Sequence, residues 1–297
     1  MTTLEEIGTR LAGGESLQPA DVEVLLGADD LLGLGAAADE LRRRRHGDRT
    51  TFARVQEVPI AAVGSSGVEI SPAAGEVRLA GRPEGARQAV DAVHGVAAAA
   101  GSIPVTGFAV DVLAELAAGD LQALRGLVAE LKAAGLSLVA EARAERLPGP
   151  EWLEAVGGAG LRIGRLTVGE ADEDGGLALI RRLAGWGGAV AHAHAVAPLP
   201  RVLRTQPTTG YRDLRQVALA RLLVDNIDSI QVDWSLYGPK LAQVALLFGA
   251  DDVDSVSPAD GQSRGPRRTP LEEITRNIRA SAQVPVERNG CFEGLER

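Results

Sequence analysis

Residues 207–258 read PTTGYRDLRQVALARLLVDNIDSIQVDWSLYGPKLAQVALLFGADDVDSVSP, and this stretch decides the fold class. Apolar residues recur at helical spacing across 214–223, and the following segment 229–238 has the composition of a buried strand. Pro239 can begin the next helix, because a first turn does not need its missing N–H. Gly249 ends that helix before a second predicted strand. This helix–strand–helix–strand order predicts a parallel α/β fold.

The same alternation extends upstream without an interrupting linker. The predicted strands are 50–58, 75–81, 103–112, 136–145, 161–170, 189–200, 229–238 and 251–258. Eight strands separated by helices predict an α/β fold of the (β/α)8 TIM-barrel type with an N-terminal helical extension. A doubly wound open sheet is the alternative. It is less favoured because no Gly-rich phosphate fingerprint follows the first strand.

We expect a single domain over residues 1–297. Residues 1–47 are predicted to be N-terminal helices and residues 48–257 the barrel. Residues 258–297 are predicted to hold a polar loop, a last helix and the tail.

Composition narrows the function classes. The 297 residues are 45% hydrophobic and carry a formal net charge of −9, with the acidic residues spread along the chain. This charge argues against a general affinity for nucleic acid or for an anionic membrane. No apolar run approaches the length that spans a bilayer, and the polar N-terminus does not read as a secretory signal. We therefore expect a cytoplasmic protein.

The C-terminal part of the sequence carries a family resemblance. ARLLVDNI at 220–227, a strand containing Trp234, and GPKLAQVALLFGADDVDS at 238–255 follow one another. This order resembles the aminofutalosine synthase and dehypoxanthine futalosine cyclase family. These are radical S-adenosylmethionine enzymes of the futalosine route to menaquinone, and the resemblance implies a TIM-type barrel. Weaker likeness extends from about Leu11 to Val286.

The sequence departs from this family in its cysteines. The family holds its four-iron cluster with a CxxxCxxC motif after the first strand, whereas this chain continues there as PIAAVGSSGVEISPAAG (59–75) and has one cysteine, Cys291. Thiolates are the ligands that hold such clusters. We therefore predict that the protein has no 4Fe–4S cluster, that it is not a radical enzyme of the usual kind, and that it binds S-adenosylmethionine weakly or not at all.

Several candidate ligand-binding residues fall at predicted strand ends. Gly81 and Arg82 occupy the place of the family's Gly-Gly motif, which contacts the methionine part of the cofactor. Glu145 falls where the resemblance places a glutamate that binds a ribose hydroxyl. Glu141, Arg143 and Glu145 alternate onto one strand face, which we expect to point into the barrel. They form either a polar ligand clamp or an internal salt-bridge layer.

His192 and His194 are separated by one residue on the predicted sixth strand, so both imidazoles are expected on its inner side. Such a pair can supply two metal ligands, with Asp233 or Glu145 as a carboxylate third. The favoured alternative is that both histidines form hydrogen bonds in a polar lumen or bind an organic ligand, so a divalent metal is not the leading expectation.

The predicted seventh strand adds three candidates. Asp233 shares a face with Gln231, and the sequence leaves open which way this face points. If it points inward, Trp234 packs outward. In the opposite orientation Trp234 would be a stacking platform for a base or an aromatic acid. Asp111, at the end of the third strand, is a further candidate at the barrel mouth.

These observations leave three functional readings. The first is a cluster-less barrel of the menaquinone pathway that binds a small polar or nucleoside-like ligand, with a pathway protein as a partner. The second is a non-radical lyase, isomerase or hydrolase that uses His192, His194, Glu145 and Asp233. The third is a vestigial barrel retained for its structure. Fold alone does not decide whether the chain is an enzyme.

Overall fold

Eight parallel strands close into a barrel in the computed structural model, which describes residues 3–64, 68–168, 175–201, 210–224, 226–258 and 271–296. The strands are β1 (Arg49–Pro59), β2 (Glu76–Ala80), β3 (Val105–Ala109), β4 (Leu136–Arg143), β5 (Ile163–Val168), β6 (Ala193–Pro200), β7 (Ser229–Asp233) and β8 (Asp252–Val256). Each strand pairs in parallel with the next, and β1 closes the ring by pairing with both β8 and β2. The predicted (β/α)8 barrel is confirmed.

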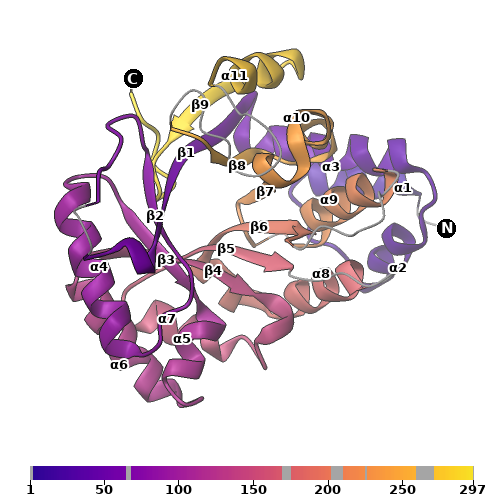
Figure 1. Ribbon diagram of the computed structural model, residues 1–297. Coiled ribbons are helices and arrows are strands. Elements are labelled where there is room, and N and C mark those ends of the chain that lie inside the picture. Colours follow the sequence, from indigo (N-terminus) through magenta and orange to yellow (C-terminus); the bar gives the residue numbers. More distant parts are fainter. Residues whose placement is uncertain are drawn as a thin grey trace.

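Helices surround the barrel (Figure 1). They are α4 (Ala86–Ala100), α5 (Val110–Leu116), α6 (Leu121–Ala133), α7 (Glu151–Gly158), α8 (Gly175–Gly185), α9 (Tyr211–Leu223) and α10 (Trp234–Ala245), with α11 (Leu271–Ala280) close to the C-terminus. Short 3-10 helices are η1 (Ile60–Ala62), η2 (Ala144–Arg146), η3 (Gly187–His192) and η4 (Leu246–Phe248). Within the described ranges, no helix combines the length and apolar character needed to cross a membrane.

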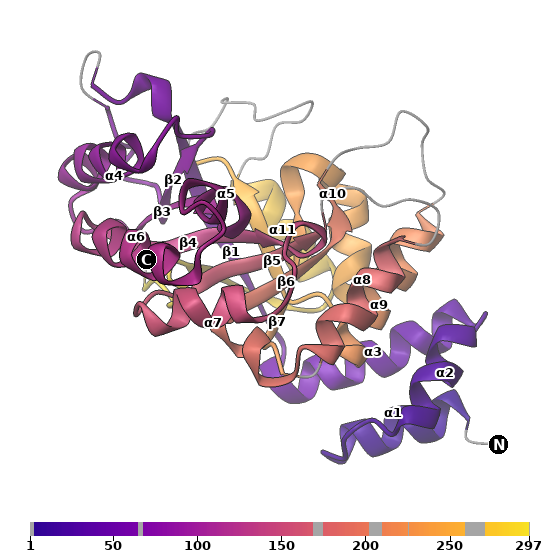
Figure 2. The same cartoon turned by 90° about the horizontal axis from the view of Figure 1, so that it is seen from below.

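The N-terminal residues form the predicted helices, α1 (Leu4–Ala12), α2 (Pro19–Gly27) and α3 (Leu31–His46). Helix α3 packs against α9, and α1 packs against α3, so the extension lies beside the barrel and away from its axis (Figure 2). Residues 259–270, for which we expected a loop, lie outside the described residues.

The seventh strand is shorter than predicted. It ends at Asp233, whose carboxylate accepts the backbone N–H of Leu236 and thereby caps α10. An aspartate in this position supplies one of the acceptors that a helix start lacks. Helix α10 is kinked at Gly238, where φ is 75°, and Pro239 begins its second segment. The expected strand over 229–238 is therefore wrong beyond Asp233.

A ninth strand was not predicted. Strand β9 (Val284–Arg288) pairs in parallel with residues 49–53 of β1, whereas β2 pairs with residues 55–59 on the same edge. Strand β9 therefore fills the space beside β1 at the N-terminal end of the barrel. The chain then turns back, and Arg288 pairs with Gly294 in an antiparallel bridge.

Strand alternation separates an apolar layer from a polar lumen. Leu166 and Val196 are register partners that belong to the hydrophobic core beneath the helices. The neighbouring partners alternate to the other side, where Arg165 pairs with Ala195 and Thr167 with Ala197. Alanines on β6 leave room for the long side chain of Arg165 inside the barrel.

Gly249, which follows η4, lies at a close contact with α9 and α3. Its φ is +97°, and an added Cβ would lie 2.9 Å from the Cβ of Arg221 and 3.0 Å from that of Ala38. Gly210 also has a left-handed backbone, with φ 78° and ψ −25°, but nothing among the described residues lies within 4 Å of its added Cβ. We expect Gly210→Ala to lower the free energy of unfolding by about 1–2 kcal/mol through backbone strain alone. Gly249→Ala should cost about 1–3 kcal/mol more because it also overpacks the core. Equal losses in urea unfolding would show that packing at Gly249 is not limiting.

Candidate functional site

Asp254 is the centre of an ion network inside the barrel. It is fully buried on β8 and accepts two hydrogen bonds from Arg78 of β2, at 3.0 and 2.9 Å, and one from Arg165 of β5, at 2.8 Å. Burial by itself raises the pKa of Asp254, yet the charges of Arg78 and Arg165 outweigh it and hold that pKa well below its usual range. Asp254 is therefore a permanent anion at neutral pH.

The network continues on the side of β2 and β3. Arg78 also donates to Glu76 at 2.7 Å, and Thr106 of β3 donates its hydroxyl proton to the same carboxylate oxygen at 2.6 Å. All three side chains are buried. Arg78 is therefore held between the carboxylates of Glu76 and Asp254, which fixes the plane of its guanidinium group.

The upper part of the network reaches solvent. Glu141 of β4 lies 3.5 Å from Arg165 and 3.9 Å from Arg201, which follows β6. Arg201 also pairs with Asp233 at 3.0 Å. The side chains of Glu141 and Arg201 retain 20% and 26% of their exposure. These two groups connect the buried charges to the C-terminal mouth, where barrel enzymes bind their ligands.

Arg143 completes this part of the mouth. Its guanidinium group forms a two-point ion pair with Asp111 in the first turn of α5, while 33% of its side chain stays exposed. Burial lowers the pKa of Arg143, but the hydrogen bond and charge of Asp111 outweigh it and raise that pKa above its usual value. We call Glu141, Arg143 and Arg201 the rim, because they are the partly exposed charges above the buried network.

Asp233 is held from several directions. One carboxylate oxygen accepts the hydroxyl of Ser235 at 2.7 Å and caps α10, and the other accepts Arg201 and the hydroxyl of Ser255 at 3.0 Å. Ser255 has a φ of 62°, an uncommon backbone for a residue other than glycine. Phe108 at the end of β3 also has a positive φ, 63°. Strained residues of this kind gather at binding and catalytic sites.

Two polar atoms on β5 have no partner among the described residues. Arg165 Nε and Thr167 Oγ1 are buried and form no hydrogen bond within the described ranges. Both residues alternate onto the face of β5 that carries the ion network. Buried polar atoms of native proteins are nearly always paired, so these two mark a place where water or a ligand atom is expected.

The structure brings some predicted residues together and separates others. Glu141, Arg143, Asp111 and Asp233 meet at the C-terminal mouth, as expected, and Glu141 and Asp233 join an internal salt-bridge layer. Glu145 follows in η2, so it is not on the strand face that we assigned to it. Four further residues were predicted to bind a ligand at this end of the barrel, namely Gly81, Arg82, Gln231 and Trp234.

These four lie apart from the rim. Gly81 and Arg82 follow β2, where Arg82 is exposed and pairs with Glu115. Gln231 lies deeper and donates to Asp252 at 2.7 Å. Trp234 is fully buried in the hydrophobic core. Of the two orientations left open, the structure therefore shows the one in which Trp234 packs into the core, and Trp234 is not a stacking platform for a ligand.

The placement of the two histidines was wrong. His192 ends η3, where its ring lies against Gly157 of α7, and only His194 belongs to β6. Both are at the N-terminal end of β6, whereas Asp233 is at the C-terminal end of β7. Residues 187–192 form the 3-10 helix η3 after α8, so the strand starts at Ala193, four residues later than predicted, and His192 lies outside it.

His194 is part of a separate cluster. Its ring stacks on Phe292 with the centroids 4.6 Å apart. Burial, together with the charges of Arg162 and Arg288, lowers the pKa of His194 to about 4. Its imidazole is therefore neutral at pH 7. Among the residues that the structure describes, no group of three or more His, Cys, Asp or Glu side chains is placed to hold a metal ion.

The residues that carry the network were missed from sequence. Asp251 and Asp252 look like a solvated acidic turn, yet both are buried, and Asp252 forms a two-point ion pair with Arg288 at 2.6 and 2.7 Å. The available signal was charge alternation within apolar strands, as in Glu76 with Arg78 and Asp252 with Asp254. Charges at i and i+2 of a buried strand share one face, which must then be polar.

The residues present do not fit an iron–sulfur cluster. The sequence has one thiol, Cys291, which follows β9 and is held through its backbone N–H by Asn289 at 2.8 Å. Burial, Glu293 and Glu76 raise the pKa of this thiol, with Ser137 at the N-terminal end of β4 as its side-chain neighbour. It therefore lies at the end of the barrel opposite to the connection that follows β1, and it is not the thiolate that a cluster needs.

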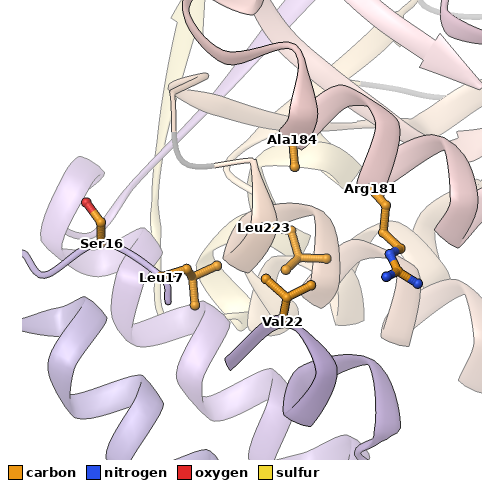
Figure 3. Close-up of a pocket in the computed structure, with 6 residues that line it drawn as sticks. All are labelled: Ser16, Leu17, Val22, Arg181, Ala184 and Leu223. Carbon is orange, nitrogen blue, oxygen red and sulfur yellow. The ribbon is translucent and has the colours of Figure 1, made fainter. Parts of the chain in front are cut away.

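A cavity of about 300 Å³ lies outside the barrel, between the N-terminal helices and the α8–α9 pair. Figure 3 shows Leu17, Val22 and Leu223 facing one another there, with Arg181 beside them. No residue that we predicted to bind ligand lines it, so we place the candidate site at the barrel mouth.

Known proteins support the family resemblance. Residues 196–293 match the family described as "CofH/MqnC C-terminal region". The chain is 38% identical over 98 residues to the aminodeoxyfutalosine synthase of Streptomyces coelicolor, which is 31% of this chain and 25% of that protein. It is 37% identical over 111 residues to the 5-amino-6-(D-ribitylamino)uracil–L-tyrosine 4-hydroxyphenyl transferase of Methanothermobacter thermautotrophicus, which is 35% of this chain and 30% of that protein. The matches thus span less than a third of the length of these relatives.

Solved structures support the barrel. Methylornithine synthase (PylB) superposes with a TM-score of 0.64 at 15% identity, covering 94% of this chain and 97% of that one. HydG, a maturase of the [FeFe]-hydrogenase, superposes with a TM-score of 0.65 at 14% identity, covering 97% of this chain and 76% of that one. At such identities the likeness concerns the fold. The sequence matches confirm the resemblance to the futalosine-type radical S-adenosylmethionine family.

Asp254 should control stability far more than an exposed ion pair does. Asp254→Asn keeps the shape but leaves Arg78 and Arg165 without their shared counter-charge, and we expect a loss of about 3–5 kcal/mol in the free energy of unfolding. The matched control is Glu40→Gln, whose partner Arg44 lies 3.1 Å away with both side chains about half exposed. It should cost no more than about 1 kcal/mol. Similar losses for both variants in urea unfolding at pH 7 would contradict the assignment of Asp254 as the centre.

Proposed function

We propose that this barrel, whose C-terminal third matches the CofH/MqnC family, binds a small polar, nucleoside-like molecule at its C-terminal mouth. The supporting observation is the rim, where Glu141, Arg143 and Arg201 stay partly exposed above fully paired buried charges. The buried network holds Glu141 and Arg201, and Asp111 holds Arg143, so these three side chains are in place before any ligand arrives. Such preorganisation reduces the entropy that binding must overcome.

The rim chemistry suits a sugar-linked heterocycle. The Glu141 carboxylate can accept hydrogen bonds from hydroxyl groups, and the guanidinium groups of Arg143 and Arg201 can donate to carbonyl or carboxylate oxygens. The transferase relative is named for a ribityl group joined to an aminouracil. This kind of molecule carries both sets of groups. We infer that a futalosine-type nucleoside of the menaquinone pathway is the class of ligand.

The protein is proposed to act without a four-iron cluster. Its thiol content and the position of Cys291 leave that cofactor without ligands. The amino-acid end of S-adenosylmethionine would then have no iron to bind, so its affinity should be weak or absent. An accessory role beside another protein of the pathway agrees with this reading.

Non-radical catalysis at the mouth is the second candidate function. The strained backbone of Ser255 and its hydroxyl contact with Asp233 favour it, because strain of this kind is frequent at catalytic sites. Glu141 would be the acid–base group, since it is the partly exposed carboxylate of the rim. His192 and His194 have no part in this version, because they lie at the other end of the barrel.

The absence of a cluster can be tested directly. After anaerobic reconstitution with iron and sulfide, we expect fewer than one iron per chain and no broad charge-transfer absorbance, because one thiolate cannot hold a cluster. A Cys291→Ser variant should give the same iron content as the natural sequence. About four irons per chain in the natural sequence, lost in this variant, would contradict the proposal.

Ligand titration can show whether the barrel mouth, and not another part of the protein, is the binding site. Titration calorimetry should show a futalosine-type nucleoside binding more tightly than S-adenosylmethionine. Glu141→Gln and Arg201→Gln should each weaken that binding by about tenfold, because each removes a charge-assisted hydrogen bond. His194→Gln, at the opposite end, is the matched control and should leave the affinity unchanged. The proposed site is wrong if neither compound binds, or if the control loses as much affinity as the rim variants.

A further inference from the structure

A second polar cavity lies at the N-terminal end of the barrel. Its volume is about 350 Å³, and it is lined by Arg45, His46, Arg49, Thr51, His194, Asp228, Ser229, Asp251, Arg288 and Phe292. These residues come from the end of α3, the starts of β1, β6, β7 and β8, and the tail after β9. We propose that this N-terminal cavity is a binding site for a phosphate group, either free or as a phosphate monoester.

The floor of the cavity is a rigid stack. The guanidinium group of Arg288 lies 3.8 Å from the ring centroid of Phe292, and the ring of His194 stacks on Phe292 within 4° of parallel. Phe292 adopts a φ of 64°, which is strained for a bulky residue. The protein thus maintains the ring in a costly backbone conformation, and such strain tends to occur where a ligand is held.

The charges around the cavity are unbalanced toward the positive. The lining holds three arginines, of which Arg288 is already paired with Asp252, and two aspartates, Asp228 and Asp251. Asp251 is already paired, because it lies 3.4 Å from His46 and accepts the buried Arg221. The exposed side chain of Arg49 forms no hydrogen bond or ion pair with any described residue. On a chain with a net charge of −9, a cavity of this sign favours an anion.

The groups available suit an oxyanion with several acceptor oxygens. Arg49 can present a planar fork of donors, and the neutral ring of His194 can donate one further hydrogen bond. The lowered pKa of His194 has the positive charges of Arg162 and Arg288 among its causes, after burial. The same positive field that disfavours a protonated imidazole favours a bound phosphate.

This cavity is independent of the mouth. The N-terminal face of a barrel ordinarily contributes stability, since ligands bind at the C-terminal ends of the strands. Here β9 and the tail that follows it add Arg288 and Phe292 to that face. The N-terminal end of this barrel therefore has a charged and aromatic lining. The proposed nucleoside site at the rim shares no residue with it.

The four histidines provide a local readout on the full-length protein. Imidazole proton resonances are followed by NMR during titration with inorganic phosphate, at pH 7.5 and constant ionic strength with chloride as the exchanged anion. We expect saturable shifts for His46 and His194, which line the cavity, and none for His94, which lies on α4 far from it. Shifts that do not saturate, or equal shifts at His94, would overturn the proposal.

Variants and ligand arms sharpen the test. Arg49→Gln should weaken phosphate binding by about tenfold, because it removes a charged donor. Arg44→Gln is the matched control, since Arg44 belongs to the same basic region, is exposed and does not line the cavity. Ribose 5-phosphate tests the monoester, and acetate tests a carboxylate. Equal weakening by both variants, or a stronger response to acetate than to either phosphate compound, would overturn the assignment.

Discussion

The structure depends on one constraint, which is that every charge inside the barrel must be paired. Asp254 is fully buried, and its desolvation is compensated only because Arg78 of β2 and Arg165 of β5 reach it inside the lumen. A single unpaired charge in such surroundings costs several kcal/mol of desolvation free energy, whereas two opposite charges that pair there offset this cost. Strand register therefore has an electrostatic reason as well as an apolar one, since a slip by one residue would exchange the charged face with the face beneath the helices.

Side-chain size makes this arrangement feasible. Arginine is the longest donor available, and the barrel accommodates Arg165 because its register partner on β6 is Ala195. The pairing also joins the two halves of the chain. Asp233 and Asp254 belong to the segment 196–293 that matches the known family, whereas Arg78 and Arg165 come from the preceding half. The matched segment thus supplies the central carboxylate, Asp254, and the rest of the barrel supplies the two arginines that neutralise it.

Sequence reasoning succeeded where the pattern is local and failed where partners are distant. Eight strands and the N-terminal helices follow from apolar spacing, and all of them exist. Strand ends were less accurate, because the cap at Asp233 and the 3-10 run before Ala193 depend on single hydrogen bonds. The histidines were misplaced for that reason, since β6 starts at Ala193 and both side chains therefore lie at its N-terminal end. The ion pairs of Asp252 and Asp254 could not be assigned, because their partners are separated by tens to more than a hundred residues.

Strand β8 links the two ends of the barrel through its acidic residues. Asp254 binds the buried arginines Arg78 and Arg165 below the rim, and Asp252, two positions earlier on the same face, binds Arg288 of the floor. The positive charge of Arg288 also acts on Asp254, where it is one of the causes that lower the pKa of that carboxylate. The ion pairs therefore form a continuous column along the barrel axis, with a rim that is open to solvent above and a cationic cavity below. Because low dielectric strengthens interactions between buried charges, a change of charge at either end acts on one shared set of side chains.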